Sequence, residues 1–130
     1  MGIYLIIFFG GGFFGFAIDT TYRSLLAGRY LSGTWLPLFS ITYALAAVME
    51  WLIFSQLAGH WQWQIVVATL TAILWELSAG LLSGFILHQR FWNYSNSFLN
   101  FRGLIDLQHS FYWLILTIVY RGVFYWIKGW

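Results

Sequence analysis

Four long apolar segments constrain the fold of this chain more than any other feature of its sequence. Each is about 20 residues or longer, the length that a helix needs to cross the hydrocarbon core of a bilayer. In a bilayer the backbone must satisfy its own hydrogen bonds, and a helix does so within one segment. The sequence therefore predicts an all-α integral membrane protein with four transmembrane helices in a bundle, at roughly residues 3–22, 35–57, 63–87 and 108–127.

The composition favours the bilayer as the solvent. Apolar residues make up 61% of the 130 residues and charged residues only 8%, whereas a soluble domain carries about 25% charged residues. The formal net charge of +2 comes from scattered side chains, so no nucleic-acid partner is expected. The absence of cysteine excludes thiol catalysis and cysteine-bound zinc. We expect one domain over residues 1–130, embedded in lipid and without a cofactor.

Arginines predict the orientation of the helices, because cytoplasmic loops carry an excess of Lys and Arg. The second loop contains no Lys or Arg. The first loop contains Arg23 and Arg29, and the third contains Arg90 and Arg102. We therefore expect loops one and three in the cytoplasm and both termini outside, although Lys128 at the C-terminus opposes this assignment. Tryptophans near the predicted helix ends indicate an aromatic belt at the interfaces: Trp35, Trp51, Trp61, Trp63, Trp92, Trp126 and Trp130.

Each predicted helix carries one ionisable residue on a small or polar face: Asp19, Glu50, Glu76 and Arg121. A charge at mid-bilayer costs about 2.5–3.5 kcal/mol on insertion scales, so such residues are candidates for binding or coupling. We expect the four to converge inside the bundle or at a subunit contact, with Glu50 as the acidic partner of Arg121. Two alternatives stay open. Glu50 can snorkel to the outer headgroups, and Glu76 can be a purely structural hydrogen-bond acceptor.

The first segment places Gly11, Gly15 and Asp19 at a spacing of four, so they share one helix face. Small residues at this spacing predict close packing of the backbone against a neighbouring helix. Arg23 follows Asp19 by one turn and can pair with it. That pair is either part of a functional site or an anchor at the interface.

The third loop is the other candidate site. It combines aromatic faces, amide donors, a cation and a glycine able to take a positive φ: Trp92, Tyr94, Asn100, Arg102 and Gly103. Asp106 and His109 follow one helical turn apart, and together with His88 they can ligate a metal such as zinc or manganese. The alternative is that Asp106 caps the next helix and that the histidines are interfacial.

The same part of the chain resembles a known family. The resemblance rests on Trp75-Glu76, Gly80, Phe85-Ile86-Leu87, Gln89, Trp92, Tyr94-Ser95, Phe98, Gly103-Leu104-Ile105 and Leu107. This pattern is similar to that of the ABC-transporter type IV membrane family, which includes small bacterial membrane proteins and the animal transmembrane protein 229 group. That family has a membrane Glu, a Trp-Asp-Tyr-Ser loop and Asn-x-x-Gly-x-Ile. Asp19 stands where Glu is usual, Asn93 where Asp is usual, and Ala44 where Gly is usual.

The resemblance implies a protein of the bacterial cytoplasmic membrane that serves as a membrane subunit, or permease, of a transport system and binds a lipid or small polar solute. No G-x-x-x-x-G-K-S/T motif is present, so ATP-driven activity needs a separate ATPase or other membrane subunit. Four helices are few for enclosing a path, which favours a homo-oligomer. No hydrolase or metalloprotease motif is present, so we do not expect an enzyme. The alternative is a structural or assembly subunit of a larger membrane complex without transport activity.

Overall fold

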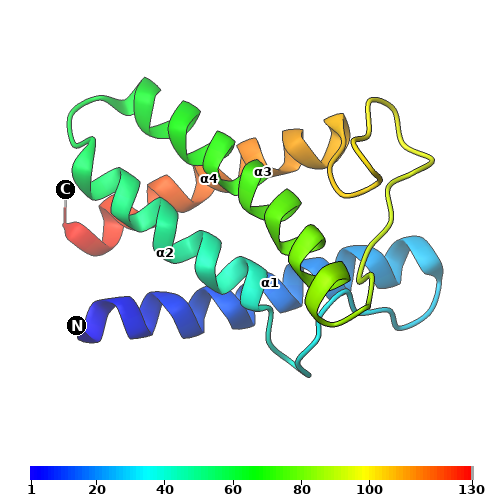
Figure 1. Cartoon of the computed structure of the whole chain (residues 1–130). Coiled ribbons are helices and arrows are strands. Elements are labelled where there is room, and N and C mark those ends of the chain that lie inside the picture. The colour runs from blue at the N-terminus through cyan, green and yellow to red at the C-terminus, as the bar shows by residue number, and fades with distance from the viewer. Residues whose placement is uncertain (130) are drawn as a thin grey trace. The chain divides into compact units, whose positions relative to one another are not determined.

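A computed structural model of the chain describes residues 1–129, and these residues form an all-helical structure. Its helices are α1 (Gly2–Ala27), α2 (Ile41–Gln56), α3 (Trp61–Ile86) and α4 (Leu107–Lys128) (Figure 1). Three of them, α1, α3 and α4, are long and apolar enough to cross a membrane. The prediction of an all-α membrane protein is therefore confirmed, whereas a fourth complete span is not.

The second helix differs most from its predicted bounds. We expected a helix over residues 35–57, but α2 begins at Ile41 and has 16 residues. Leu36 and Phe39 form an isolated bridge, and Leu38 between them has a φ of 61°. Pro37 explains the turn, because proline lacks a backbone N–H donor and disfavours a helical residue before it. At about 1.5 Å per residue, α2 is roughly 24 Å long, shorter than the hydrocarbon core of about 30 Å.

The first helix is longer than expected. We predicted its end near residue 22, but α1 continues to Ala27 and ends at Gly28, which has a φ of 64°. A left-handed glycine immediately after the last turn is a common helix terminator, because it lacks the Cβ that makes this conformation unfavourable. Arg23 therefore belongs to α1 itself rather than to the first loop.

The chain divides into two compact units, Met1–Val48 and Met49–Trp130, of which Trp130 lies outside the described residues. The first unit contains α1 and the beginning of α2. The second contains the rest of α2, α3, the third loop and α4. A single domain with all four helices in one bundle stays a prediction.

Within the first unit, the glycine face of α1 packs against the beginning of α2. A Cβ added to Gly11 would lie 2.6 Å from the Cβ of Ala47, and one added to Gly15 would lie 2.1 Å from the Cβ of Tyr43. Real Cβ atoms are not found this close to other carbon atoms, so both positions require glycine for this packing. The predicted small-residue packing face is confirmed.

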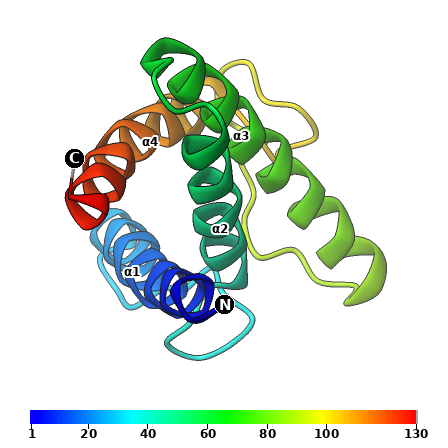
Figure 2. The ribbon, with the colours of Figure 1, turned by 90° about the vertical axis from the view of Figure 1, so that its left-hand side faces the viewer.

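Within the second unit, α3 and α4 pack against each other (Figure 2). α3 buries a residue at every fourth position, and most of these residues are small: Gln64, Ala68, Ala72, Glu76 and Gly80. α4 buries Trp113, Thr117 and Phe124. Small residues allow two helix backbones to approach closely, and the two polar residues of the α3 stripe are thereby carried into the interior.

Candidate functional site

Glu76 is a buried carboxylate in the middle of an apolar helix. Its side chain belongs to α3, and only 7% of the residue is exposed. The Oε1 atom accepts a hydrogen bond from the Tyr94 hydroxyl at 3.1 Å, and the Oε2 atom accepts one from Trp113 Nε1 at 2.8 Å. Tyr94 belongs to the third loop and Trp113 to α4, so one carboxylate connects three segments of the chain. Donors to both oxygens lower the cost of placing a carboxylate away from water.

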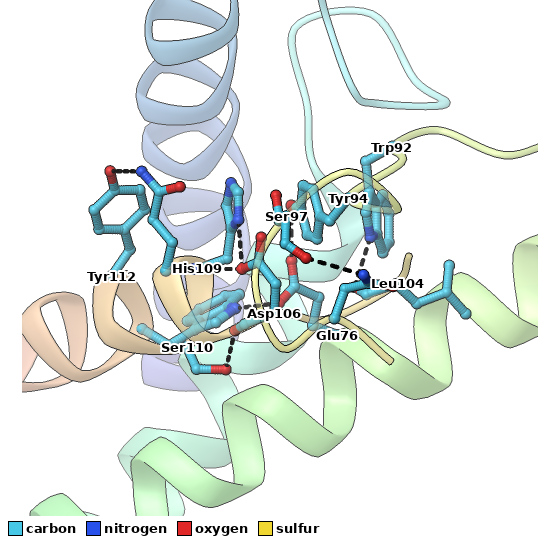
Figure 3. A network of polar contacts seen from close by, with 12 residues as sticks. Glu76, Trp92, Tyr94, Ser97, Leu104, Asp106, His109, Ser110 and Tyr112 are labelled. Carbon is cyan, nitrogen blue, oxygen red and sulfur yellow. Dashed lines mark hydrogen bonds and ion pairs between the residues drawn. The ribbon is translucent and has the colours of Figure 1, made fainter. Parts of the chain in front are cut away.

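The third loop sits on α3 beside this carboxylate. Trp92 Nε1 donates a hydrogen bond of 2.9 Å to the Leu104 carbonyl, which joins the two arms of the loop (Figure 3). A Cβ added to Gly80 would lie 2.7 Å from Leu104 Cδ2 and 3.2 Å from Trp92 Cζ2. Gly80 lies one turn beyond Glu76 on the same stripe, so its missing side chain lets the loop approach the helix where Tyr94 reaches the carboxylate.

The polar side chains predicted for the loop hold its own turns. Asn100 Nδ2 donates to the carbonyls of Ser95 at 3.1 Å and Ser97 at 2.9 Å, and Asn100 Oδ1 accepts from Gly103 N at 3.0 Å. Gly103 has the expected positive φ, 66°, and a Cβ there would lie 2.7 Å from Asn93 Oδ1. The Asn100 side-chain amide therefore stabilises the conformation of the loop through hydrogen bonds to the loop's own backbone.

The outer surface of the loop presents a cation and apolar side chains. Arg102 is exposed, and its guanidinium lies 5.8 Å from the centre of the Phe101 ring. Phe98 and Leu99 beside it are exposed as well. Arg90 supports the loop by donating to the backbone carbonyl of Arg102. This surface is separate from the Glu76 cluster, to which the loop contributes Tyr94.

Asp106 caps α4, as one of the two interpretations of this residue predicted. Its Oδ1 accepts a hydrogen bond of 2.6 Å from the His109 backbone N–H and lies 2.7 Å from His109 Nδ1. The His109 ring stacks on Tyr94 with a centroid distance of 3.7 Å (Figure 3). No group of three His, Cys, Asp or Glu side chains able to hold a metal occurs among residues 1–129, so His88 does not join this pair in such a site.

A second polar cluster joins α2, α3 and α4 within the second unit. Glu50 is 4% exposed, and its Oε1 accepts a hydrogen bond of 2.7 Å from the Thr117 hydroxyl. Arg121 Nε donates to Gln64 Oε1 at 2.6 Å, and its guanidinium lies 4.5 Å from the centre of the Tyr125 ring. Each of these helices therefore contributes a polar side chain to the cluster.

This cluster contradicts two expectations. Glu50 does not snorkel to headgroups, because it is buried against Thr117. Arg121 does not pair with Glu50: within residues 1–129 its hydrogen bond goes to Gln64, and no ion pair joins it to a carboxylate. The reason is the four-residue stripe of α3, which places the Gln64 amide opposite Arg121. Gln64 was not among the predicted site residues, because it lies near the start of its helix. It precedes Glu76 by twelve residues, a multiple of the four-residue spacing, and this spacing could have placed it on the same buried face.

The ionisable residues of the helices therefore have separate partners. Glu50 binds Thr117, and Glu76 binds Tyr94 and Trp113. Asp19 pairs with Arg23 in the first unit, with Oδ2 and Nε 2.7 Å apart, as the one-turn spacing predicted. Convergence of Asp19 with the other three stays a prediction.

Only some of the tryptophans of the predicted aromatic belt are exposed, and their position at the membrane interface stays a prediction. Trp35, Trp61, Trp63 and Trp126 are exposed. Trp51 is 2% exposed and packs edge-on against Phe124, and Trp92 is also buried. These two tryptophans therefore belong to the protein interior, because their rings fill space between segments. Trp130 lies outside the described residues.

The comparison with known families covers almost the whole chain. The family described as "Putative ABC-transporter type IV" matches residues 6–128 of the chain. The chain belongs to this family. Membership in the type IV family and three long apolar helices make it an integral membrane protein related to transport. No curated protein and no solved structure is similar enough to count as a match.

Proposed function

We propose that this chain is the membrane subunit, or permease, of a transport system and that it binds a lipid or small polar solute. One observation carries the proposal: Glu76 is buried at the middle of α3 and is bonded to a residue of the third loop. An apolar residue at this position would avoid the free-energy cost of burying a carboxylate in a membrane helix. The presence of Glu76 therefore favours a role in binding or coupling. Family membership supports the same conclusion.

Tyr94 provides a route from the loop to the membrane carboxylate. Its hydroxyl donates to Glu76, and its ring stacks on His109 of α4. A partner that displaced the loop would lengthen or break the hydrogen bond to Glu76. The carboxylate would then lose one of its donors, and its affinity for a proton, cation or polar solute would change. This is the coupling that a transport subunit requires between a soluble domain and a membrane site.

The partner in this proposal is a separate ATPase, because the sequence contains no phosphate-binding loop of its own. The exposed Phe98, Leu99 and Arg102 of the third loop form the contact surface. The proposal places this loop and the first in the cytoplasm of a bacterial cell and both termini outside. It also includes a homo-oligomer, since α2 is short and the chain offers few helices to enclose a path. The chain itself has no enzymatic activity in this account.

The test compares Glu76→Gln with Ser78→Ala. Gln keeps a hydrogen-bond acceptor of similar shape but cannot carry the charge, whereas Ser78 is exposed on the same helix. Each tagged variant is purified from its native membrane, and ATP hydrolysis by the purified complex is measured. We expect the Glu76→Gln protein to insert into the membrane and to keep its partner, but its complex should lose ATP hydrolysis. The complex of the Ser78→Ala protein should keep ATP hydrolysis. Unchanged hydrolysis in both variants contradicts the proposal.

A structural or assembly subunit is the second candidate. The observation that favours it is that both oxygens of Glu76 already accept hydrogen bonds within the protein. Such contacts between membrane helices contribute about 0.6 kcal/mol on average and can act as connections between segments alone. In that case Glu76→Gln would lower the stability of the protein or release its partner, with no separate loss of ATP hydrolysis.

A further inference from the structure

Arg121 carries unused hydrogen-bond donors. Its Nε donates to Gln64, but within residues 1–129 its terminal Nη1 and Nη2 groups make no hydrogen bond or ion pair. These groups are not fully buried. The fully buried side-chain atoms without a partner in residues 1–129 are Thr20 Oγ1, Thr69 Oγ1 and Asp106 Oδ2, and no atom of Arg121 is among them. A guanidinium keeps its charge in proteins, so these donors are available to an anion from outside the chain.

The neighbours of Arg121 hold its guanidinium in one orientation. Gln64 Nε2 donates to the Phe54 carbonyl at 2.9 Å and to the Tyr125 hydroxyl at 2.8 Å, so the amide that receives Arg121 Nε is itself fixed. The Tyr125 ring lies under the guanidinium at 4.5 Å. The terminal edge of a planar guanidinium matches two oxygens of a phosphate. Here that edge is oriented before any ligand binds.

The hydrogen bond to Gln64 holds the Arg121 guanidinium near an end of α3 that carries exposed tryptophans. Gln64 belongs to the first turn of α3, which begins at Trp61. Trp61 and Trp63 at this end of α3, and Trp126 near the end of α4, are exposed. Exposed tryptophans of membrane helices gather at headgroup depth. Although Arg121 lies within α4, a side chain of this length can extend toward the depth where lipid phosphates are found.

The charges of the surrounding elements favour an anion. Neither residues 57–75 nor residues 107–129 contain an acidic residue, and Lys128 adds a second cation near the end of α4. Glu50, the acid of this cluster, is buried and accepts a hydrogen bond from Thr117. An anion beside Arg121 would thus meet cations and donors.

From these observations we propose that Arg121, oriented by Gln64 and Tyr125, binds the phosphate of an anionic phospholipid. This site is separate from the Glu76 cluster. Gln64 and Glu76 lie on the same helix, and at about 1.5 Å per residue they are roughly 18 Å apart. The proposed function places binding at Glu76, so the lipid site at Arg121 is an additional site, and it does not depend on whether the protein transports a solute.

The test measures lipid retention by native mass spectrometry. The full chain is delipidated in detergent and offered equal amounts of phosphatidylglycerol and phosphatidylcholine. We expect the wild type to retain phosphatidylglycerol in preference to phosphatidylcholine. In Arg121→Gln the ratio of the two retained lipids should fall about tenfold, the effect expected when a hydrogen bond to a charged group is lost. Arg121→Lys should lose less, because it keeps the charge but not the planar fork. The matched control is Arg29→Gln, which removes an exposed arginine and should behave as the wild type.

Three results would overturn the proposal. One is equal retention of the two lipids by the wild type, which needs no variant and stands even if Arg121→Gln fails to insert. Another is an equal loss of preference in Arg29→Gln and Arg121→Gln, which would indicate a general effect of net charge. The third concerns the source of the phosphate: binding of millimolar inorganic phosphate by the wild type, without preference for phosphatidylglycerol, would identify a free-anion site.

Discussion

Thr117→Val should destabilise the protein through Glu50. The substitution keeps the shape of the side chain and removes the hydroxyl that donates to Glu50 Oε1 at 2.7 Å. Thr117 is 0% exposed and Glu50 4%, so water cannot replace the lost donor easily. The carboxylate would stay buried without the hydrogen bond that the structure gives it.

The size of this effect follows from the burial of the pair. A hydrogen bond to a charged group contributes about 1.5–3 kcal/mol in soluble proteins, whereas contacts between membrane helices average about 0.6 kcal/mol and reach about 1.7 kcal/mol. Because the pair is almost fully enclosed, we expect the coupling between Glu50 and Thr117 to lie near the upper membrane value, at about 1–2 kcal/mol.

A pair of double-mutant cycles measures this coupling. The first combines Glu50→Leu with Thr117→Val, and the second combines Glu50→Leu with Arg121→Gln. The free energy of unfolding of each variant is measured by denaturation of the protein in detergent micelles. The first cycle should give about 1–2 kcal/mol. The second should give less, because no hydrogen bond or ion pair joins Glu50 to Arg121 within residues 1–129. A larger coupling in the second cycle would refute the assignment of Thr117, rather than Arg121, as the partner of Glu50.

Three further predictions concern packing, loop conformation and the Glu76 cluster. Gly15→Ala should lower the free energy of unfolding by about 1–3 kcal/mol, because the new Cβ would lie 2.1 Å from the Cβ of Tyr43. The control Gly122→Ala should not lower it, because a Cβ there meets nothing within 4 Å. Equal thermal midpoints of the two variants would contradict the prediction. Gly103→Ala should speed proteolysis of the third loop, because alanine is strained at a φ of 66°; an unchanged cleavage rate would show that the loop does not need this conformation. Trp113→Phe should cost about 1 kcal/mol of unfolding free energy by removing a donor to Glu76, and a neutral result would mean that the hydrogen bond adds no stability.

The sequence was informative where spacing or a single residue type determines the local structure. The four-residue spacing of Gly11 and Gly15 predicted their close packing, and Gly103 was expected at a positive φ. The one-turn spacing of Asp19 and Arg23 predicted their ion pair. These features depend on the geometry of one helix or one turn, which a short stretch of residues specifies.

Features that depend on contacts between distant segments were less accessible. Pairing Arg121 with Glu50 followed from charge and depth alone, but an amide in the first turn of α3 takes its Nε hydrogen bond. Trp51 was placed at the interface for a similar reason, although its ring fills the interior beside Phe124. Side-chain reach and the rotation of each helix decide such contacts, and neither can be read from hydropathy. Glu76 was recognised as buried, but its donors, Tyr94 and Trp113, follow only from the folded loop.

We propose that this chain is the membrane subunit of an ATP-driven transport system. The most direct measurement is quantitative mass spectrometry of the proteins that co-purify with the tagged chain from its native membrane under mild conditions. We expect a protein with a phosphate-binding loop to be enriched in a fixed ratio to the chain, and to be lost when the exposed Arg102 of the third loop is changed to Glu. Recovery of a large membrane complex that contains no ATPase would contradict it.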